Sequence, residues 1–434
     1  LVVVDENGEI QPSLAESWTP SEDGLSYTFK LKEGVQFHNG EELKASDVVY
    51  TVNRFIEEEW MLFCSFMIEG AEALDDYNVK INLKYPYGSF LSNLEYMYIV
   101  NQKTMEEMGD EASKNPIGTG PYKFVKWDVA QQIVLEANED YFGKKASIKN
   151  LTFKIIPDAN TAFVALETGE ADLSFNVSPI DFEQAQNNEK FGTDSCAGNS
   201  CYFVNFNSEK LDKTVRQALC YAINKETVNT MVNEGTGIVT NLPLLEGQEG
   251  YTTDLETYNY DVEKAKELLA QAGVEPGTLN IDFFYGEGTE NDKLGQTLQS
   301  MFNEVGVNLT LNPVETGTWW QLFGEGDYYV SRGGYPMEAA NTDMPYYDMY
   351  HKDGTFNVSR INNPEINELL EQGRTELDAE KRNEIYVKVS QIIAEEAYCL
   401  PLYFNRSTIV YNKDLKNVKA VNNQRYLYSN FSWE

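Results

Sequence analysis

The residue types that most often carry out chemistry are scarce in this 434-residue chain, which holds two histidines, His38 and His351, and five cysteines. It contains no HExxH or GxSxG motif and no catalytic cysteine–histidine arrangement, so no common hydrolase site is indicated. His351 has no second histidine or cysteine near it in the sequence, and one side chain seldom holds a transition metal. Because the chain has 69 acidic residues, coincidental carboxylate pairs are inevitable. The sequence therefore predicts no catalytic residue, no metal site and no cofactor, and a secreted hydrolase is only a remote alternative.

One stretch, residues 318–338, combines aromatic residues, glycines and opposite charges. It contains Trp319, Trp320, Arg332, Tyr335 and Glu338. A zwitterionic ligand that loses water at both ends needs an opposite, hydrogen-bonded charge at each end. A sugar would not need an arginine and a glutamate facing it, so the two charges favour a short peptide over an oligosaccharide. Because neighbouring residues of a regular element point in different directions, one of the two tryptophans is expected in the core.

Composition excludes several partners. The net charge of −35 and a pI of about 4.4 make binding to nucleic acid or to anionic membranes improbable. No apolar run approaches the ~18–20 residues that cross a bilayer. The five cysteines cannot all pair within the chain, although a loop disulfide between Cys196 and Cys201 is open.

Hydrophobic periodicity predicts a mixed α/β protein. Alternating residues at 27–31 and 79–83 indicate half-buried strands, and Asn39-Gly40 indicates a tight turn. Residues 151–175 and 281–311 each read as strand, helix, strand. A helix that joins two parallel strands makes a right-handed crossover, so two such units predict two α/β lobes.

Several motifs occur in a fixed order. The first is Pro12-Ser13-Leu14-Ala15-Glu16-Ser17-Trp18, and the others are residues 115–122, 203–207, 215–225, 359–366 and 400–403. In this order the chain closely resembles the extracellular solute-binding proteins, family 5, of ABC importers, which bind oligopeptides, dipeptides or nickel. The resemblance extends over essentially the whole chain. One departure is that the first strand and helix usual in the family, which help to form the cleft, are absent from this sequence.

This resemblance implies a two-lobed, periplasmic-binding-protein-like fold of type II with an extra outer domain. Residues 1–118 would form the outer domain, residues 119–225 with 400–434 the first cleft lobe, and residues 226–399 the second. The crossings near 225 and 400 would form a two-strand hinge, and the ligand would bind in the cleft by clamshell closure.

The resemblance also assigns roles within residues 318–338. Glu338 falls where an acidic residue, usually Asp, pairs with the amino terminus of a peptide. Arg332 falls where an arginine can meet a carboxylate, and Tyr335, Trp319 and Trp320 fall where aromatic residues line the cleft. The expected partners are a short peptide and the permease subunits of an ABC transporter, with a metal chelate or an oligosaccharide as alternative ligands. The expected protein is a monomer, extracellular or periplasmic, with a lipid anchor on an N-terminal cysteine outside this sequence.

Overall fold

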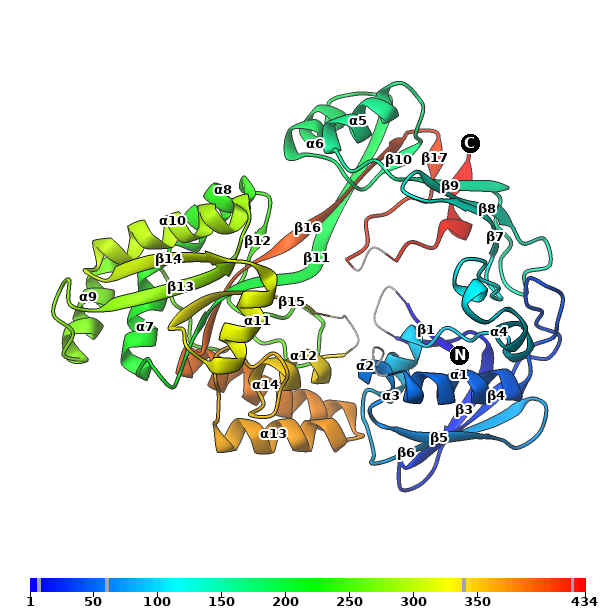
Figure 1. Cartoon of the computed structure of the whole chain (residues 1–434), viewed down its shortest axis with the longest axis horizontal. Coiled ribbons are helices and arrows are strands. Elements are labelled where there is room, and N and C mark those ends of the chain that lie inside the picture. The colour runs from blue at the N-terminus through cyan, green and yellow to red at the C-terminus, as the bar shows by residue number, and fades with distance from the viewer. Residues whose placement is uncertain (6–8, 59–61, 338–340, 423–424) are drawn as a thin grey trace. The chain divides into compact units, whose positions relative to one another are not determined.

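The computed structural model describes residues 1–5, 9–58, 62–337, 341–422 and 425–434, and these residues form two compact units (Figure 1). Unit 1 contains Leu1–Cys196 and Ser407–Glu434, and unit 2 contains Ala197–Arg406. The chain passes from one unit to the other within strands β11 (Phe191–Phe206) and β16 (Cys399–Asn412). The three-part division expected from the sequence stays a prediction.

Unit 1 contains a four-stranded antiparallel sheet in the strand order β3-β4-β6-β5. Tyr27, Phe29 and Leu31 of β4 are buried while their neighbours are not, as their alternation predicts. The expected turn at Asn39-Gly40 is present, and Gly40 has a φ of +86°, which glycine adopts without strain. The four strands are β3 (Ala15–Pro20), β4 (Ser26–Leu31), β5 (Ile68–Ala73) and β6 (Asn78–Leu83).

The remaining strands of unit 1 form smaller sheets. They are β1 (Val2–Val4) with β2 (Ile10–Pro12), the three-stranded β7 (Tyr122–Asp128), β8 (Gln132–Ala137) and β9 (Asn150–Lys154), and β17 (Leu415–Lys416) with β18 (Ser432–Trp433). The helices are α1 (Ala45–Glu57), α2 (Leu62–Ser65), α3 (Phe90–Asn93), α4 (Gln102–Met108), α5 (Ala159–Glu167) and α6 (Pro179–Gln186), with 3-10 turns at Leu94–Tyr96, Gly109–Ser113 and Tyr428–Asn430.

The crossover predicted over residues 151–175 is wrong, although its strand, helix and strand are present. Strand β9 pairs antiparallel with β8, whereas β10 (Leu173–Ser174) pairs antiparallel with β16. The two strands therefore lie in different sheets. Periodicity along a chain identifies an element but does not identify its hydrogen-bonding partner.

A seven-stranded sheet, most of which lies in unit 2, carries the second predicted crossover, which is confirmed as a parallel pair. Strands β13 (Asn280–Gly286) and β14 (Asn308–Val314) are parallel and are joined by helix α10 (Thr289–Glu304). The seven-stranded sheet has the order β10-β16-β11-β15-β13-β14, and β12 (Ile238–Val239) also pairs with β16. Strand β15 (Val330–Pro336) runs antiparallel to β11 and parallel to β13.

Two apolar cores cover opposite faces of this sheet in unit 2. Val204 and Phe206 of β11 belong to one core, while Cys201 and Phe203 belong to the other. The alternation of β11 thus separates the two faces. The other helices of unit 2 are α7 (Lys213–Ala222), α8 (Lys225–Asn233), α9 (Val262–Gln271), α11 (Thr316–Glu325), α12 (Asp343–Tyr350), α13 (Pro364–Thr375) and α14 (Ala379–Glu396).

His38 and the cysteines, which the sequence offered as reactive side chains, have structural surroundings in the fold. His38 Nε2 lies 3.0 Å from the carbonyl oxygen of Gly120, which ties the Asn39-Gly40 turn to the segment before β7. Among the residues that the structure describes, the cysteines form no disulfide, so the open Cys196–Cys201 disulfide is not formed. Within the described ranges, no group of three or more histidine, cysteine or acidic residues could hold a metal ion, and no helix is long and apolar enough to span a membrane.

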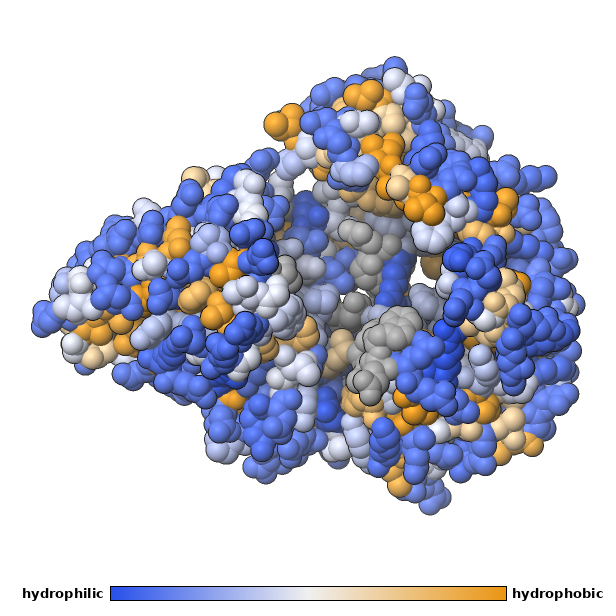
Figure 2. All heavy atoms as spheres, in the orientation of Figure 1, coloured by the Kyte–Doolittle hydropathy of each residue, from blue (hydrophilic) through white to orange (hydrophobic). Residues whose placement is uncertain are grey.

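Hydrophilic residues cover most of the face in Figure 2, with apolar residues in small groups.

Candidate ligand-binding site

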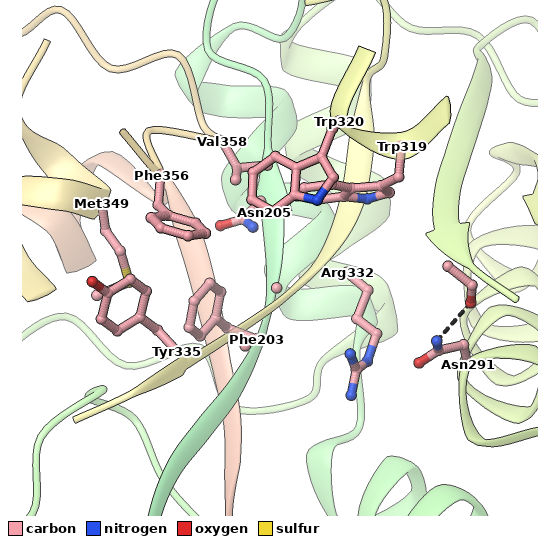
Figure 3. A pocket seen from close by; sticks show the side chains of 13 residues that line it. Phe203, Asn205, Asn291, Trp319, Trp320, Arg332, Tyr335, Met349, Phe356 and Val358 are labelled. Carbon is pink, nitrogen blue, oxygen red and sulfur yellow. Dashed lines mark hydrogen bonds between the residues drawn. The ribbon is translucent and has the colours of Figure 1, made fainter. Parts of the chain in front are cut away.

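A pocket of about 270 Å³ lies in unit 2, at the end of strand β13 (Figure 3). Strand β13 ends at Gly286. Strand β15 pairs with β13 only as far as Ser331 and then continues without this partner. The Asn291 side chain, in the first turn of α10, donates to the carbonyl oxygen of Gly286 at 2.6 Å and fixes this corner. The carboxyl ends of strands in α/β sheets are common ligand sites. The volume is slightly below the ~300–1,000 Å³ of typical small-molecule pockets, so it suits a small ligand or part of a longer one.

The tryptophan pair, Trp319 and Trp320, lines this pocket from α11. The two rings meet edge to face with centroids 4.9 Å apart, and Trp320 also meets Phe356 at 5.5 Å. The prediction that one tryptophan belongs to the core is wrong, since Trp319 is half-buried and Trp320 is 45% exposed. Two adjacent residues of a helix project about 100° apart, and large indole rings span that angle at the border of an open pocket.

Arg332 also lines the pocket, and its guanidinium lies over the ring of Tyr202, 4.8 Å from the centroid. Among the described residues, this guanidinium has no carboxylate within ion-pair distance. The stacking contact holds the arginine in place and leaves its hydrogen-bond donors available for an anion.

Tyr335 lines the same pocket with its ring but uses its hydroxyl group within the protein. The hydroxyl donates to Asp348 Oδ2 at 2.7 Å, and the ring meets Phe356 edge to face at 5.3 Å. Burial raises the pKa of Tyr335 and also that of Asp348. Tyr335 therefore contributes an apolar surface. It leaves β15 on the opposite face from Arg332, because side chains alternate along a strand.

Asn205 lines the pocket too, and sequence reasoning did not single it out. Its side chain is only 4% exposed, and Oδ1 accepts a hydrogen bond from the Ser359 hydroxyl at 3.2 Å. The amide Nδ2 has no hydrogen-bond partner. The alternation of Phe203 and Asn205 on one strand was the available signal, since it places a polar residue on an apolar face.

The structure therefore brings four of the five predicted site residues to one pocket: Trp319, Trp320, Arg332 and Tyr335. The fifth, Glu338, lies outside the described residues, so its role stays a prediction.

Comparison with known proteins identifies the family. The family model of bacterial extracellular solute-binding proteins, family 5, matches residues 9–357. The chain belongs to this family. Membership confirms the resemblance read from the sequence and the expectation of a binding protein rather than an enzyme.

Individual family 5 relatives agree with this assignment. The oligopeptide-binding protein AppA of Bacillus subtilis is 30% identical, over 100% of this chain and 85% of its own length. The structure of DppA from Helicobacter pylori in complex with the peptide STSA has 28% identity and a TM-score of 0.83, covering 100% of this chain and 91% of that one. NikA from Brucella suis, in complex with Fe(III)-EDTA, has 25% identity and a TM-score of 0.89, covering 100% and 93%. The predicted fold of periplasmic-binding-protein type is thereby confirmed.

Proposed function

We propose that this family 5 protein captures a short peptide outside the cell and delivers it to the permease subunits of an ABC importer. The observation that carries the peptide assignment is the Arg332 guanidinium, which faces an aromatic pocket with no carboxylate partner among the described residues. The similarity to AppA and to peptide-bound DppA supports the same ligand class.

A peptide matches the chemistry of the pocket. Its carboxylate would accept charge-assisted hydrogen bonds from Arg332. An apolar or aromatic side chain would pack against the tryptophan pair and Tyr335, whose hydroxyl group is already bonded to Asp348. Glu338 would pair with the peptide amino group. A few such contacts could supply micromolar affinity, which corresponds to about −8 kcal/mol.

Delivery would use the loaded form of a monomer. Ligand binding would favour a closed arrangement by its higher affinity for that state, and the permease would recognise the closed form. A lipid anchor on an N-terminal cysteine outside this sequence would keep the protein at the outer face of the cytoplasmic membrane.

The proposal is tested by calorimetry with peptides of two to five residues, alongside oligosaccharides and a nickel–histidine chelate. We expect binding of peptides only. The matched variant Glu338→Gln should lose affinity for peptides with a free amino group but bind N-acetylated peptides as the wild type does. Binding of the sugars or the chelate, without binding of any peptide, would refute the proposed ligand class.

A further inference from the structure

The amide nitrogen of Asn205 is an unused hydrogen-bond donor in the wall of the unit 2 pocket. Only 4% of the Asn205 surface is exposed, yet its Nδ2 has no hydrogen-bond partner. A buried donor normally has a partner, because leaving it unpaired loses the hydrogen bonds that it would make to water. An unpaired donor that borders a ligand pocket points to an acceptor on the ligand.

A neighbouring hydroxyl group lies against the Asn205 amide. Ser359 Oγ lies 3.2 Å from Asn205 Oδ1 and 2.8 Å from the carbonyl oxygen of Tyr398. Ser359 is itself buried. The single Ser359 hydroxyl proton is shared by these two oxygens, and with Oδ1 turned toward it, Nδ2 is the atom left for a ligand.

The backbone beside Asn205 leaves room for this buried donor. Gly333 lies opposite Phe203 on the neighbouring strand β15. A Cβ atom at position 333 would come within 2.6 Å of Asn205 Nδ2 and 2.2 Å of the Phe203 ring. Any side chain at this position would therefore clash with the amide and with the Phe203 ring, so glycine is needed for the buried donor to keep its place in the pocket wall.

The surroundings of Nδ2 define the acceptor. Phe203, Tyr335, Met349 and Phe356 line the pocket as an apolar cluster, and Figure 3 shows the Asn205 amide between this cluster and Arg332. A neutral donor beside apolar surface suits a neutral acceptor that is followed by an apolar group. A peptide carbonyl next to an apolar side chain has this pattern.

We propose that Asn205 Nδ2 donates a hydrogen bond to a main-chain carbonyl oxygen of the bound peptide. The apolar cluster takes the side chain next to that carbonyl. This inference rests on the proposed peptide ligand and assigns Asn205 as a ligand-binding residue that selects apolar side chains.

The test uses calorimetry on the full chain with a peptide that the wild type binds. Asn205→Ala should weaken binding by about tenfold, the upper end for one neutral hydrogen bond. Asn205→Asp, which has nearly the same shape, should weaken it further because its carboxylate would face the carbonyl oxygen. Thermal unfolding of both variants without ligand checks that they are folded.

A second measurement keeps the test independent of variant folding. A series of peptides in which each amide in turn is replaced by an ester, a weaker acceptor, is titrated into the wild type and Asn205→Ala. One ester should weaken binding to the wild type by threefold or more and leave binding to Asn205→Ala unchanged.

The outcomes separate the two proposals. If the wild type binds peptides and Asn205→Asp binds them equally well, the role of Asn205 is refuted while the proposed function stands. Equal sensitivity of the wild type and Asn205→Ala to every ester would also refute it. If the wild type binds no peptide, the proposed function and this inference both fail.

Discussion

At the scale of single residues, the pocket of unit 2 offers a charged donor and a neutral donor on opposite faces of the sheet. Arg332 stacks on Tyr202, and Asn205 is held by Ser359. In both cases a contact within the protein orients the side chain before a ligand arrives. Such preorganisation lowers the entropy cost of binding.

Arg332 gives the first prediction, which concerns the peptide carboxylate. Arg332→Ala should weaken peptide binding by at least tenfold, because it removes a charge-assisted contact from a partly buried site. Arg332→Lys should recover only part of the loss, since an ammonium group cannot form a bidentate pair. Calorimetry with free-acid and C-terminally amidated peptides checks the partner. The wild type should prefer the acid and Arg332→Ala should bind both equally, whereas a preference retained in the variant would contradict the assignment.

Lys225, the first residue of α8, gives a prediction about pH. Its side chain is 8% exposed, and Nζ donates to the carbonyl oxygen of Thr240 at 2.9 Å and to Asn241 Oδ1 at 2.7 Å. Burial lowers the pKa of Lys225 to about 8 from its ordinary value of 10.5. Above pH 8 the native state therefore loses a proton that the unfolded state keeps, so this residue makes stability rise with pH between about 8 and 10.5.

The measurement compares Lys225→Met with the wild type in urea titrations at pH 7.5 and 9.5. The free energy of unfolding of the wild type, relative to the variant, should increase by on the order of 1–2 kcal/mol over this interval. Lys264→Met is the matched control, because the Lys264 side chain is 41% exposed and should show no such difference. A wild-type advantage that stays constant or shrinks with rising pH would contradict the lowered pKa of Lys225.

At the scale of elements, helix α11 positions the tryptophan pair, and Arg360 holds the end of this helix. The Arg360 guanidinium donates to the carbonyl oxygens of Phe323 and Gly324, in the last turn of α11, and lies over the ring of Phe323. The Phe323 ring in turn stacks on Trp319, with centroids 5.6 Å apart. A cation at the carboxyl end of a helix is also favoured by the helix dipole.

Arg360→Ala should therefore weaken ligand binding without touching the ligand. We expect a threefold to tenfold loss of peptide affinity, because the tryptophan pair would no longer be fixed. Near-ultraviolet circular dichroism of the ligand-free variant should show a reduced indole signal. Arg360→Lys is the matched variant, since it keeps the charge at the helix end, and it should restore part of both signals. Unchanged affinity and an unchanged spectrum would show that α11 does not depend on this arginine.

Elements also show how far the sequence alone leads. The alternation at 27–31 and the parallel strands β13 and β14 were predictable, because each depends on a short run of residues and one connecting helix. The pairing of β10 with β16 was not predictable, since Leu173 meets Tyr411 across a large sequence separation. Asn205 was missed for a similar reason. Its free donor depends on Ser359 and on Gly333, which approach it only in the folded sheet.

At the scale of the whole molecule, the decisive feature is that the chain crosses between its two units twice. Strands β11 and β16 each contribute residues to both units, and the boundary falls after Cys196 and after Arg406. Two adjacent strands are a connection that can bend while keeping their hydrogen bonds, which suits hinge motion. The residues that line the pocket all belong to unit 2.

Closure gives the last prediction. Small-angle scattering should show a smaller radius of gyration with saturating peptide than without it, because a ligand shifts the population toward the state that it binds more tightly. Arg332→Ala at the same peptide concentration should show a smaller change, in proportion to its lower occupancy. At concentrations that saturate both proteins, the two compact forms should agree if Arg332 serves binding rather than the hinge. A radius that stays constant while calorimetry reports full occupancy would mean that the peptide binds without closure, and the double crossing would then serve only to join two rigid units.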